Sequence, residues 1–123
     1  MKGVTVKREI ELVRDILFSI EKTDDIKSIN TYPLDIVNKH VDLLIEGGFV
    51  IKNNYGFDSV FLIDYRLTWN GHEFLDAIRQ NEVWSTIKTE FKDASISTIF
   101  KVGKELVEGI TKKKLEKYIG FES

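Results

Sequence analysis

The 123-residue sequence predicts an α+β fold, and three features of the chain support this prediction. Apolar residues recur at helical spacing after Pro33, and the stripe ends at Gly47-Gly48. Two β-branched and aromatic runs, 49–51 and 60–63, predict a pair of strands. In the segment 66–78 a strand ends directly in a helix. Helix, hairpin and helix in this order are typical of a winged helix-turn-helix, here with a β-hairpin wing and additional C-terminal helices.

The first two helices are predicted by their apolar stripes. One helix is expected from about residue 6 to residue 22, with the stripe Ile10, Val13, Ile16, Leu17 and Ile20. Residues 26–30 are too short for a helix and alternate loosely, so they predict a brief strand. Pro33 fits the first turn of the second helix, because its missing N–H costs nothing there. The buried stripe of this second helix is expected to be Leu34, Val37, Val41, Leu44 and Ile45.

The hairpin is expected to carry a long loop at its end, because residues 52–59 are rich in turn formers. Its second strand is expected to end at Leu67. Thr68 has the short hydroxyl side chain that accepts a hydrogen bond from a free N–H at a helix start. The residues that follow have helical spacing in Phe74, Leu75 and Ile78. The sequence therefore predicts a strand-to-helix junction at Thr68.

Two more helices are expected after this one. The first has the stripe Val83, Trp84, Ile87 and Phe91. The second is expected to be capped by Ser95 and to break near residues 109–111, and its stripe is Ile96, Ile99, Phe100, Leu106, Val107 and Ile110. We expect a winged-helix domain in residues 1–92 and a C-terminal helical extension in residues 93–123 that packs on the same domain. The last stripe is broad enough to pair with a second chain, which predicts a homodimer through Phe100, Leu106 and Ile110.

The composition excludes several classes of site. The chain has no cysteine, which excludes disulfides, thiolate metal sites and cysteine nucleophiles. The N-terminal residues hold no apolar signal segment, and no apolar run approaches the length that spans a membrane. We therefore expect a cytoplasmic protein without a membrane partner.

Catalysis finds no support in the sequence. His40 and His72 are the only histidines, and each is expected to play a structural role. The adjacent Asp24-Asp25 is expected to form a turn after the first helix. No serine lies in a nucleophile-elbow pattern, and no glycine-rich phosphate loop precedes a helix. We expect no enzyme, no metal site and no cofactor.

Nucleic-acid binding has candidate residues but an unfavourable charge. In a winged helix the second helix reads the DNA groove and the wing holds the backbone, and the polar residues in these places are Asn38, Lys39, Lys52, Asn53 and Asn54. The net charge of the chain is −2, and residues 24–64 carry three lysines against seven acidic residues. Asp35, Asp42 and Glu46 would each repel phosphate, so a solvated face of mixed charge is the alternative.

Two other features have both a functional and a structural interpretation. Tyr55 and Phe57 flank a glycine near the end of the hairpin, where two aromatic residues either contact a partner or fold back over the core. The run 112–114 consists of three lysines. It could contact nucleic acid or an acidic membrane, but three lysines near a helix C-terminus also complement the helix dipole, and we favour this interpretation.

Four segments resemble a known family. They are Arg-Asp-Ile-Leu-Phe-Ser-Ile-Glu from residue 14, His-Val-Asp-Leu-Leu-Ile-Glu-Gly-Gly-Phe-Val from residue 40, Arg-Leu-Thr-Trp-Asn-Gly-His-Glu-Phe-Leu-Asp-Ala-Ile-Arg from residue 66 and Asn-Glu-Val-Trp-Ser-Thr-Ile-Lys from residue 81. In these segments the chain resembles a family of small winged-helix proteins of unknown function from bacteria, prophages and phages, related in layout to the YjcQ-like proteins. The resemblance implies the fold and an origin in a mobile element, and it implies no catalytic residues. Pro33 and Leu34 depart from it, since the family tends to be polar or acidic there.

Two functions of different classes follow. The first is a small DNA-binding or regulatory protein of a phage or other mobile element, with double-stranded DNA as its partner. The alternative is a protein-interaction module that uses the winged-helix fold without binding DNA, such as a phage-encoded modulator of a host protein. A positive surface across the second helix and the wing would favour DNA, and an acidic surface there would favour a protein partner.

Overall fold

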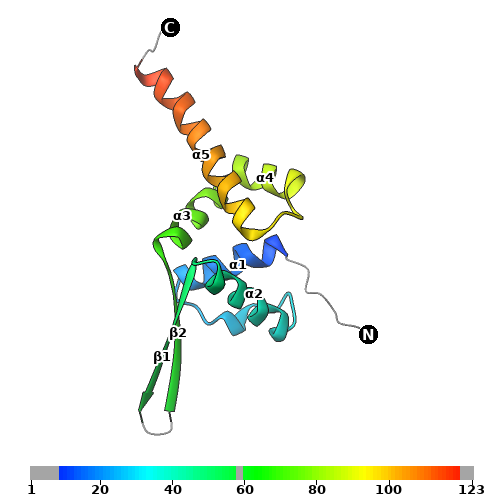
Figure 1. Cartoon of the computed structure of the whole chain (residues 1–123), viewed down its shortest axis with the longest axis vertical. Coiled ribbons are helices and arrows are strands. Elements are labelled where there is room, and N and C mark those ends of the chain that lie inside the picture. Colours follow the sequence, from blue (N-terminus) through cyan, green and yellow to red (C-terminus); the bar gives the residue numbers. More distant parts are fainter. Residues whose placement is uncertain (1–8, 58–59, 120–123) are drawn as a thin grey trace.

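The computed structural model of the chain describes residues 9–57 and 60–119, with the backbone alone for 54–57 and 60–63 (Figure 1). In this part of the chain five α-helices, one 3₁₀ helix and one antiparallel hairpin follow each other. They are α1 (Ile10–Glu21), η1 (Ile26–Ser28), α2 (Leu34–Glu46), β1 (Val50–Phe57), β2 (Val60–Leu67), α3 (Trp69–Ile78), α4 (Asn81–Glu90) and α5 (Ile96–Ile119). The predicted α+β class is confirmed.

The helices α1 to α4 and the first half of α5 form the body of the molecule. The hairpin leaves this body at one end, and the second half of α5 leaves it at the other (Figure 1). Every helix contributes to one apolar core, whose largest fully buried side chains include Leu12, Ile16, Leu17, Leu44, Phe74, Leu75, Ile78, Ile87 and Ile99. No helix among the described residues is both long enough and apolar enough to cross a membrane.

The helix α1 buries the predicted stripe but starts later than predicted. Its residues Ile10, Val13, Ile16, Leu17 and Ile20 are all buried. Glu9 has an extended backbone, so the helix begins at Ile10, and the predicted residues 6–8 lie outside the described part.

The segment after α1 is a 3₁₀ helix, so the predicted strand at residues 26–30 is wrong. The Asp25 carboxylate accepts the Lys27 N–H at 2.9 Å, which favours a helical turn over an extended chain. Ile26 is buried and Ile29 is partly buried against the core, so burial explains the two apolar residues that suggested a strand. In the described sheet β1 pairs with β2, and η1 takes no part.

The helix α2 ends where the sequence predicts, whereas its start and the hairpin differ from the prediction. Pro33 lies directly before α2, and Gly48 takes the left-handed conformation just after it, with a φ of 84°. Strand β1 pairs with β2 from Val50↔Leu67 to Phe57↔Val60. The long loop predicted at 52–59 is therefore wrong for residues 52–57, which belong to β1. Backbone pairing between strands satisfies the N–H and C=O groups there whatever the polarity of the side chains.

The predicted junction at Thr68 is confirmed. Its hydroxyl oxygen accepts the Gly71 N–H at 3.0 Å and its O–H donates to the Gly48 carbonyl at 2.6 Å. The Thr68 N–H donates to the Phe49 carbonyl at 3.0 Å. One residue thus caps α3 and ties it to the start of the hairpin.

The helix α5 is continuous, so the predicted break at residues 109–111 is wrong. The Ser95 hydroxyl accepts the Thr98 N–H at 3.1 Å, as the predicted cap requires. A Cβ added at Gly109 would meet no described atom within 4 Å, so this glycine lowers helix propensity without marking a bend. Ile96 and Ile99 are buried, and Phe100 lies 5.0 Å from the Phe49 ring and 5.6 Å from the Phe74 ring, centre to centre.

Candidate binding surface

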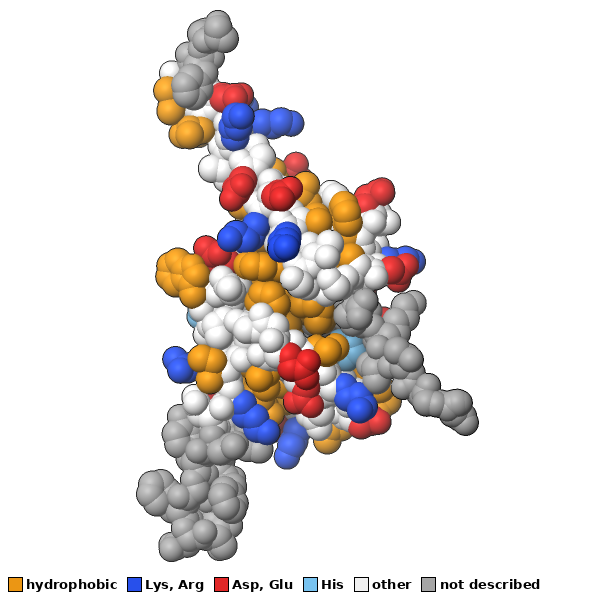
Figure 2. Space-filling model, viewed as in Figure 1, with side chains coloured by type: hydrophobic (Ala, Val, Ile, Leu, Met, Phe, Trp, Pro, Cys, Tyr) orange, Lys and Arg blue, Asp and Glu red, His pale blue; other side chains and the backbone are white. Residues whose placement is uncertain are grey.

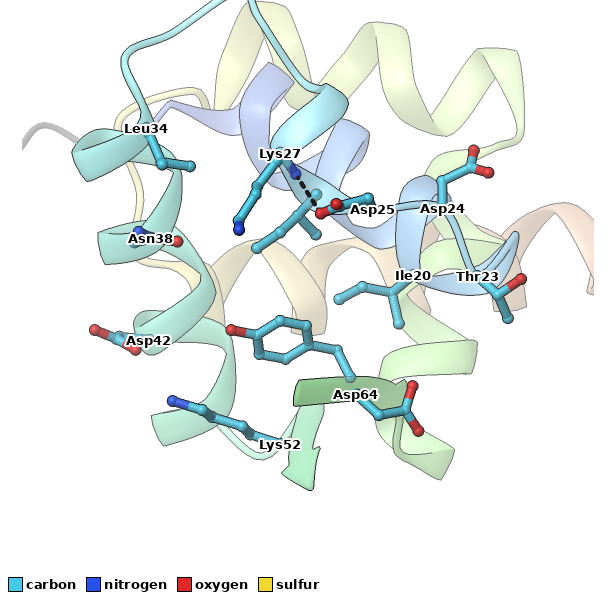
Figure 3. A pocket seen from close by; sticks show the side chains of 12 residues that line it. Ile20, Thr23, Asp24, Asp25, Lys27, Leu34, Asn38, Asp42, Lys52 and Asp64 are labelled. Carbon is cyan, nitrogen blue, oxygen red and sulfur yellow. Dashed lines mark hydrogen bonds between the residues drawn. The ribbon is translucent and has the colours of Figure 1, made fainter. Parts of the chain in front are cut away.

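A hollow of about 670 Å³ lies between the end of α1, η1, α2 and the base of the hairpin (Figure 3). Leu34, Asn38 and Asp42 lie along α2 on one side of it, and Thr23 and Asp24 lie on the other side, just after α1. The full lining is Ile20, Thr23, Asp24, Asp25, Ile26, Lys27, Leu34, Asn38, Asp42, Lys52, Asp64 and Tyr65. We call this surface the hollow.

The inner part of the hollow is apolar. Ile20 and Ile26 are buried in the core, and Tyr65 is half-buried. Leu34 is 47% exposed, so part of its apolar side chain is open to contact within the hollow. The hollow thus offers apolar contact area as well as charge.

The charges that line the hollow are mainly negative. Four carboxylates face two ammonium groups, and these six residues are Asp24, Asp25, Asp42, Asp64, Lys27 and Lys52. Burial raises the pKa of the Tyr65 hydroxyl, and the negative charge of Asp42 adds to this shift. Among the described residues, no ion pair within 4.0 Å involves any residue of the lining. The lining therefore carries an excess of negative charge that no described ion pair neutralises, and the Asp25 carboxylate within it already accepts the Lys27 N–H.

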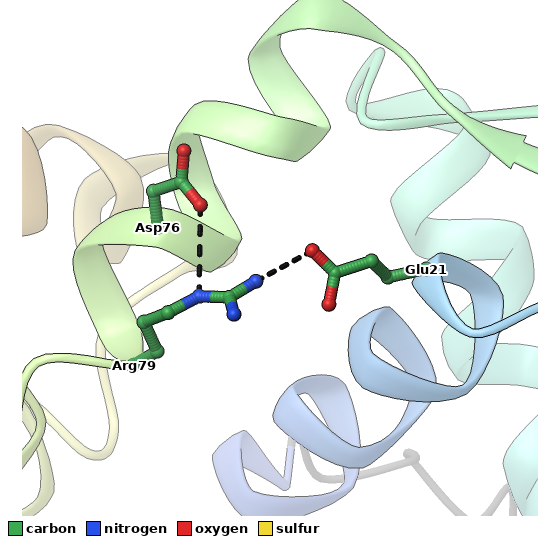
Figure 4. A network of polar contacts seen from close by, with 3 residues as sticks. All are labelled: Glu21, Asp76 and Arg79. Carbon is green, nitrogen blue, oxygen red and sulfur yellow. Dashed lines mark hydrogen bonds and ion pairs between the residues drawn. The ribbon is translucent and has the colours of Figure 1, made fainter.

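A polar network lies beside one wall of the hollow. The Arg79 guanidinium at the end of α3 donates to the Glu21 carboxylate at 2.6 Å, and its Nε lies 3.6 Å from the Asp76 carboxylate (Figure 4). Glu21 is the last residue of α1, next to the turn that lines the hollow. This exposed ion pair joins the end of α1 to the end of α3.

The residues predicted to bind nucleic acid are only partly brought together. Asn38 and Lys52 line the hollow. Lys39 is exposed on α2 outside the lining, and Asn53 is half-buried on β1. The side chain of Asn54 lies outside the described part.

The residues predicted to contact a partner are dispersed. The side chains of Tyr55 and Phe57 lie outside the described part. Phe100 packs against the rings of Phe49 and Phe74, which also contact each other, and Leu106 and Ile110 on α5 are each partly buried against the core.

Histidine 40 has a structural position, as predicted. It is fully buried, its Nε2 accepts the Glu9 N–H at 3.0 Å, and its Nδ1 lies 2.9 Å from the Ile36 carbonyl oxygen. The ring thereby joins the start of α1 to α2. His72 is exposed on α3, so the partly buried, structural position expected for it is wrong. The described residues contain no group of three or more His, Asp or Glu side chains placed to hold a metal ion.

Sequence analysis missed most of the hollow. Asp64 and Tyr65 on β2, and Asp24 and Asp25 after α1, lie far apart in the sequence and converge only in the fold. Their one common signal was the acidic charge of residues 24–64. The exposed Leu34 was assigned to the buried stripe of α2, because its spacing fits that stripe.

Comparisons with known proteins identify a family without assigning an activity. No solved structure matches the chain. An uncharacterized protein of Haemophilus influenzae (strain ATCC 51907 / DSM 11121 / KW20 / Rd) is 30% identical over 112 residues, which cover 85% of this chain and 95% of that protein. The family described as hypothetical protein (DUF2513) matches residues 7–97. The chain therefore belongs to the DUF2513 family.

Proposed function

We propose that the chain is a winged-helix protein-interaction module whose hollow binds a basic segment of a partner protein. The single observation that carries the proposal is the lining of the hollow, where four aspartates face two lysines beside the exposed Leu34. The proposed role is binding, without catalysis. A phage-encoded modulator of a host protein would act in this way, in keeping with the mobile-element origin that the family resemblance implies.

The winged-helix assignment is supported by the order and placement of the elements. Helices α1 and α2, the hairpin β1–β2 and then α3 follow in the order of that fold. The hollow lies between α2 and the base of the hairpin, which are the recognition helix and the wing in this assignment. The hollow therefore occupies the surface with which a DNA-binding winged helix contacts DNA.

The charge of this place favours a cationic partner over DNA. A DNA-binding face gains affinity when Lys and Arg replace the counterions of the phosphates. Here Asp42 and Asp64 line the hollow, and Asp35 and Glu46 are exposed on α2 nearby. Arginine pairs with carboxylates through two parallel hydrogen bonds, and the stems of Arg and Lys pack on apolar surface such as Leu34.

Calorimetric titration of the full chain with a short arginine- and lysine-rich peptide at low salt tests the proposal. We expect binding that weakens with salt. The variant Asp42→Asn with Asp64→Asn should bind roughly tenfold more weakly, since each exposed ion pair is worth about 0.2–1 kcal/mol. The matched control Glu90→Gln removes an exposed acidic residue of α4 outside the hollow and should leave binding unchanged. Equal binding by the double variant and the control would refute the proposal.

A DNA-binding regulator of a phage or other mobile element is the second candidate. It is supported by Asn38 and Lys39, which are adjacent and exposed on α2, and by Lys52 on β1. Titration into mixed-sequence duplex at about 50 mM salt tests this candidate, because low salt favours electrostatic binding. Lys39→Ala and Lys52→Ala should each weaken binding and reduce its salt dependence by about one phosphate contact. The absence of any binding would remove DNA as a partner.

A further inference from the structure

The far end of α5 carries exposed apolar side chains that no described residue covers. Residues 111–119, which we call the α5 tip, are all exposed. Leu115 is 49%, Tyr118 88% and Ile119 56% exposed. Figure 2 shows apolar and lysine side chains together on this part of the molecule, away from the body. Large apolar residues that gather in one exposed place usually mark a contact surface.

The α5 tip is also the most basic part of the described chain. It holds four lysines against one glutamate, which are Lys112, Lys113, Lys114, Lys117 and Glu116. A helical segment that packs on nothing gains little stability from its own backbone. A surface of opposite charge with some apolar area would cover the tip and stabilise the helix.

The hollow has the matching character. Its lining carries four aspartates against two lysines, and Leu34 is exposed within it. We infer that the α5 tip of one copy docks in the hollow of a second copy. This inference rests on the proposed function, because it names the basic segment that the hollow binds.

Geometry and charge favour docking of the α5 tip in the hollow of a second copy over docking within one chain and over pairing of two tips. Within one chain, α5 leaves the body at the end opposite to the hairpin, so the tip points away from its own hollow (Figure 1). Pairing of two α5 tips side by side would bring two basic segments together, and like charges repel. A contact between two different surfaces closes into a dimer if it is reciprocal and forms an open chain of molecules if it is not.

Sedimentation velocity with charge-reversed variants of the full chain tests the inference. The hollow variant is Asp42→Lys with Asp64→Lys, and the tip variant is Lys113→Glu with Lys117→Glu; all four side chains are exposed. The unmodified chain should associate at tens to hundreds of micromolar and dissociate as salt rises. Each variant alone should associate roughly tenfold more weakly or not at all, since hollow and tip then carry like charges. An equimolar mixture of the two variants should associate again, because each hollow meets a tip of opposite charge.

Three controls separate loss of folding, loss of association and loss of peptide binding. Circular dichroism should show unchanged helix content in each variant, and Leu115→Ala should weaken association without any charge change. An unmodified chain that stays monomeric, or a mixture that stays monomeric while the unmodified chain associates, would overturn the inference. If a basic peptide still binds the hollow of a monomeric chain, the proposed function stands and only the identity of the partner is wrong. If the peptide also fails to bind, both fail.

Discussion

Thr23 and Gly48 occupy the same position in two helix ends of the same kind. After α1, the Asp24 N–H donates to the Ser19 carbonyl at 2.8 Å and the Thr23 N–H donates to the Ile20 carbonyl at 3.1 Å. After α2, Phe49 and Gly48 make the corresponding bonds to Leu44 and Ile45, at 2.9 and 3.0 Å. This pattern is a Schellman motif, which needs a left-handed residue. The φ angles are 60° at Thr23 and 84° at Gly48, so a β-branched residue stands where glycine is favoured.

Thr23→Gly should therefore stabilise the protein. The left-handed conformation costs an L-residue roughly 1–2 kcal/mol, and glycine avoids most of this cost. After the greater entropy of glycine in the unfolded chain is subtracted, we expect a gain of about 0.5–1 kcal/mol in the free energy of unfolding. Urea denaturation measures it. The reverse change, Gly48→Ala, should destabilise by a similar amount, because a Cβ there would touch no described atom within 4 Å and only the backbone is strained.

Gly71→Ala should destabilise the protein more than any other glycine substitution in α3 or α5. A Cβ at Gly71 would overlap the Phe49 carbonyl oxygen. The same oxygen accepts the Thr68 N–H, so the backbone cannot move away without loss of that bond. We expect a loss of roughly 1–3 kcal/mol or more, measured as a lower denaturation midpoint.

Gly109→Ala is the matched control for Gly71→Ala. Both glycines lie in helices, but a Cβ at Gly109 would meet no described atom within 4 Å. We expect a gain of roughly 0.5–1 kcal/mol from helix propensity alone. Equal losses at the two positions would show that α3 does not approach the Phe49 carbonyl as described.

Thr68→Ala should cost about 0.5–2 kcal/mol through loss of the cap of α3. The change removes both the acceptor of the Gly71 N–H and the donor to the Gly48 carbonyl. Thr68→Ser keeps the hydroxyl and should be nearly silent in thermal denaturation. If the serine variant is as unstable as the alanine variant, the loss of stability comes from the missing methyl group and not from the missing hydroxyl.

Sequence patterns predicted the features that depend on neighbouring residues. The stripe from Ile10 to Ile20 and the caps at Thr68 and Ser95 are local, because helical spacing and cap geometry involve residues three or four apart. The same reasoning placed Gly48 correctly at the C-terminal end of α2, but Pro33 lies just before the helix and not in its first turn as predicted.

Features that depend on residues far apart in the sequence were not predictable. The approach of Gly71 to the Phe49 carbonyl and the convergence of Asp24 with Asp64 in the hollow arise only when the elements pack. Local rules also failed where backbone pairing with a distant strand outweighs propensity, as in β1, whose polar residues 52–54 suggested a loop but pair with β2. The exposure of Leu34 could not be derived either, since its spacing fits the buried face of α2.

Truncation of a large apolar side chain should lower the free energy of unfolding at the start of α5 and leave it nearly unchanged near the end of α5. Phe100 packs against the rings of Phe49 and Phe74 with centres 5.0 and 5.6 Å away, so Phe100→Ala should leave a cavity and cost roughly 3–5 kcal/mol. The sequence had suggested Phe100 as a dimer contact, in which case its replacement would yield a folded monomer. Leu115 is 49% exposed on the part of α5 that leaves the body, so Leu115→Ala should change the free energy of unfolding of the monomer by less than about 0.5 kcal/mol. Urea denaturation at low micromolar protein concentration, where association is weak, measures the free energy of unfolding of both variants. If the Phe100→Ala variant is as stable as the unmodified chain but no longer associates, Phe100 is a dimer contact and not a core residue.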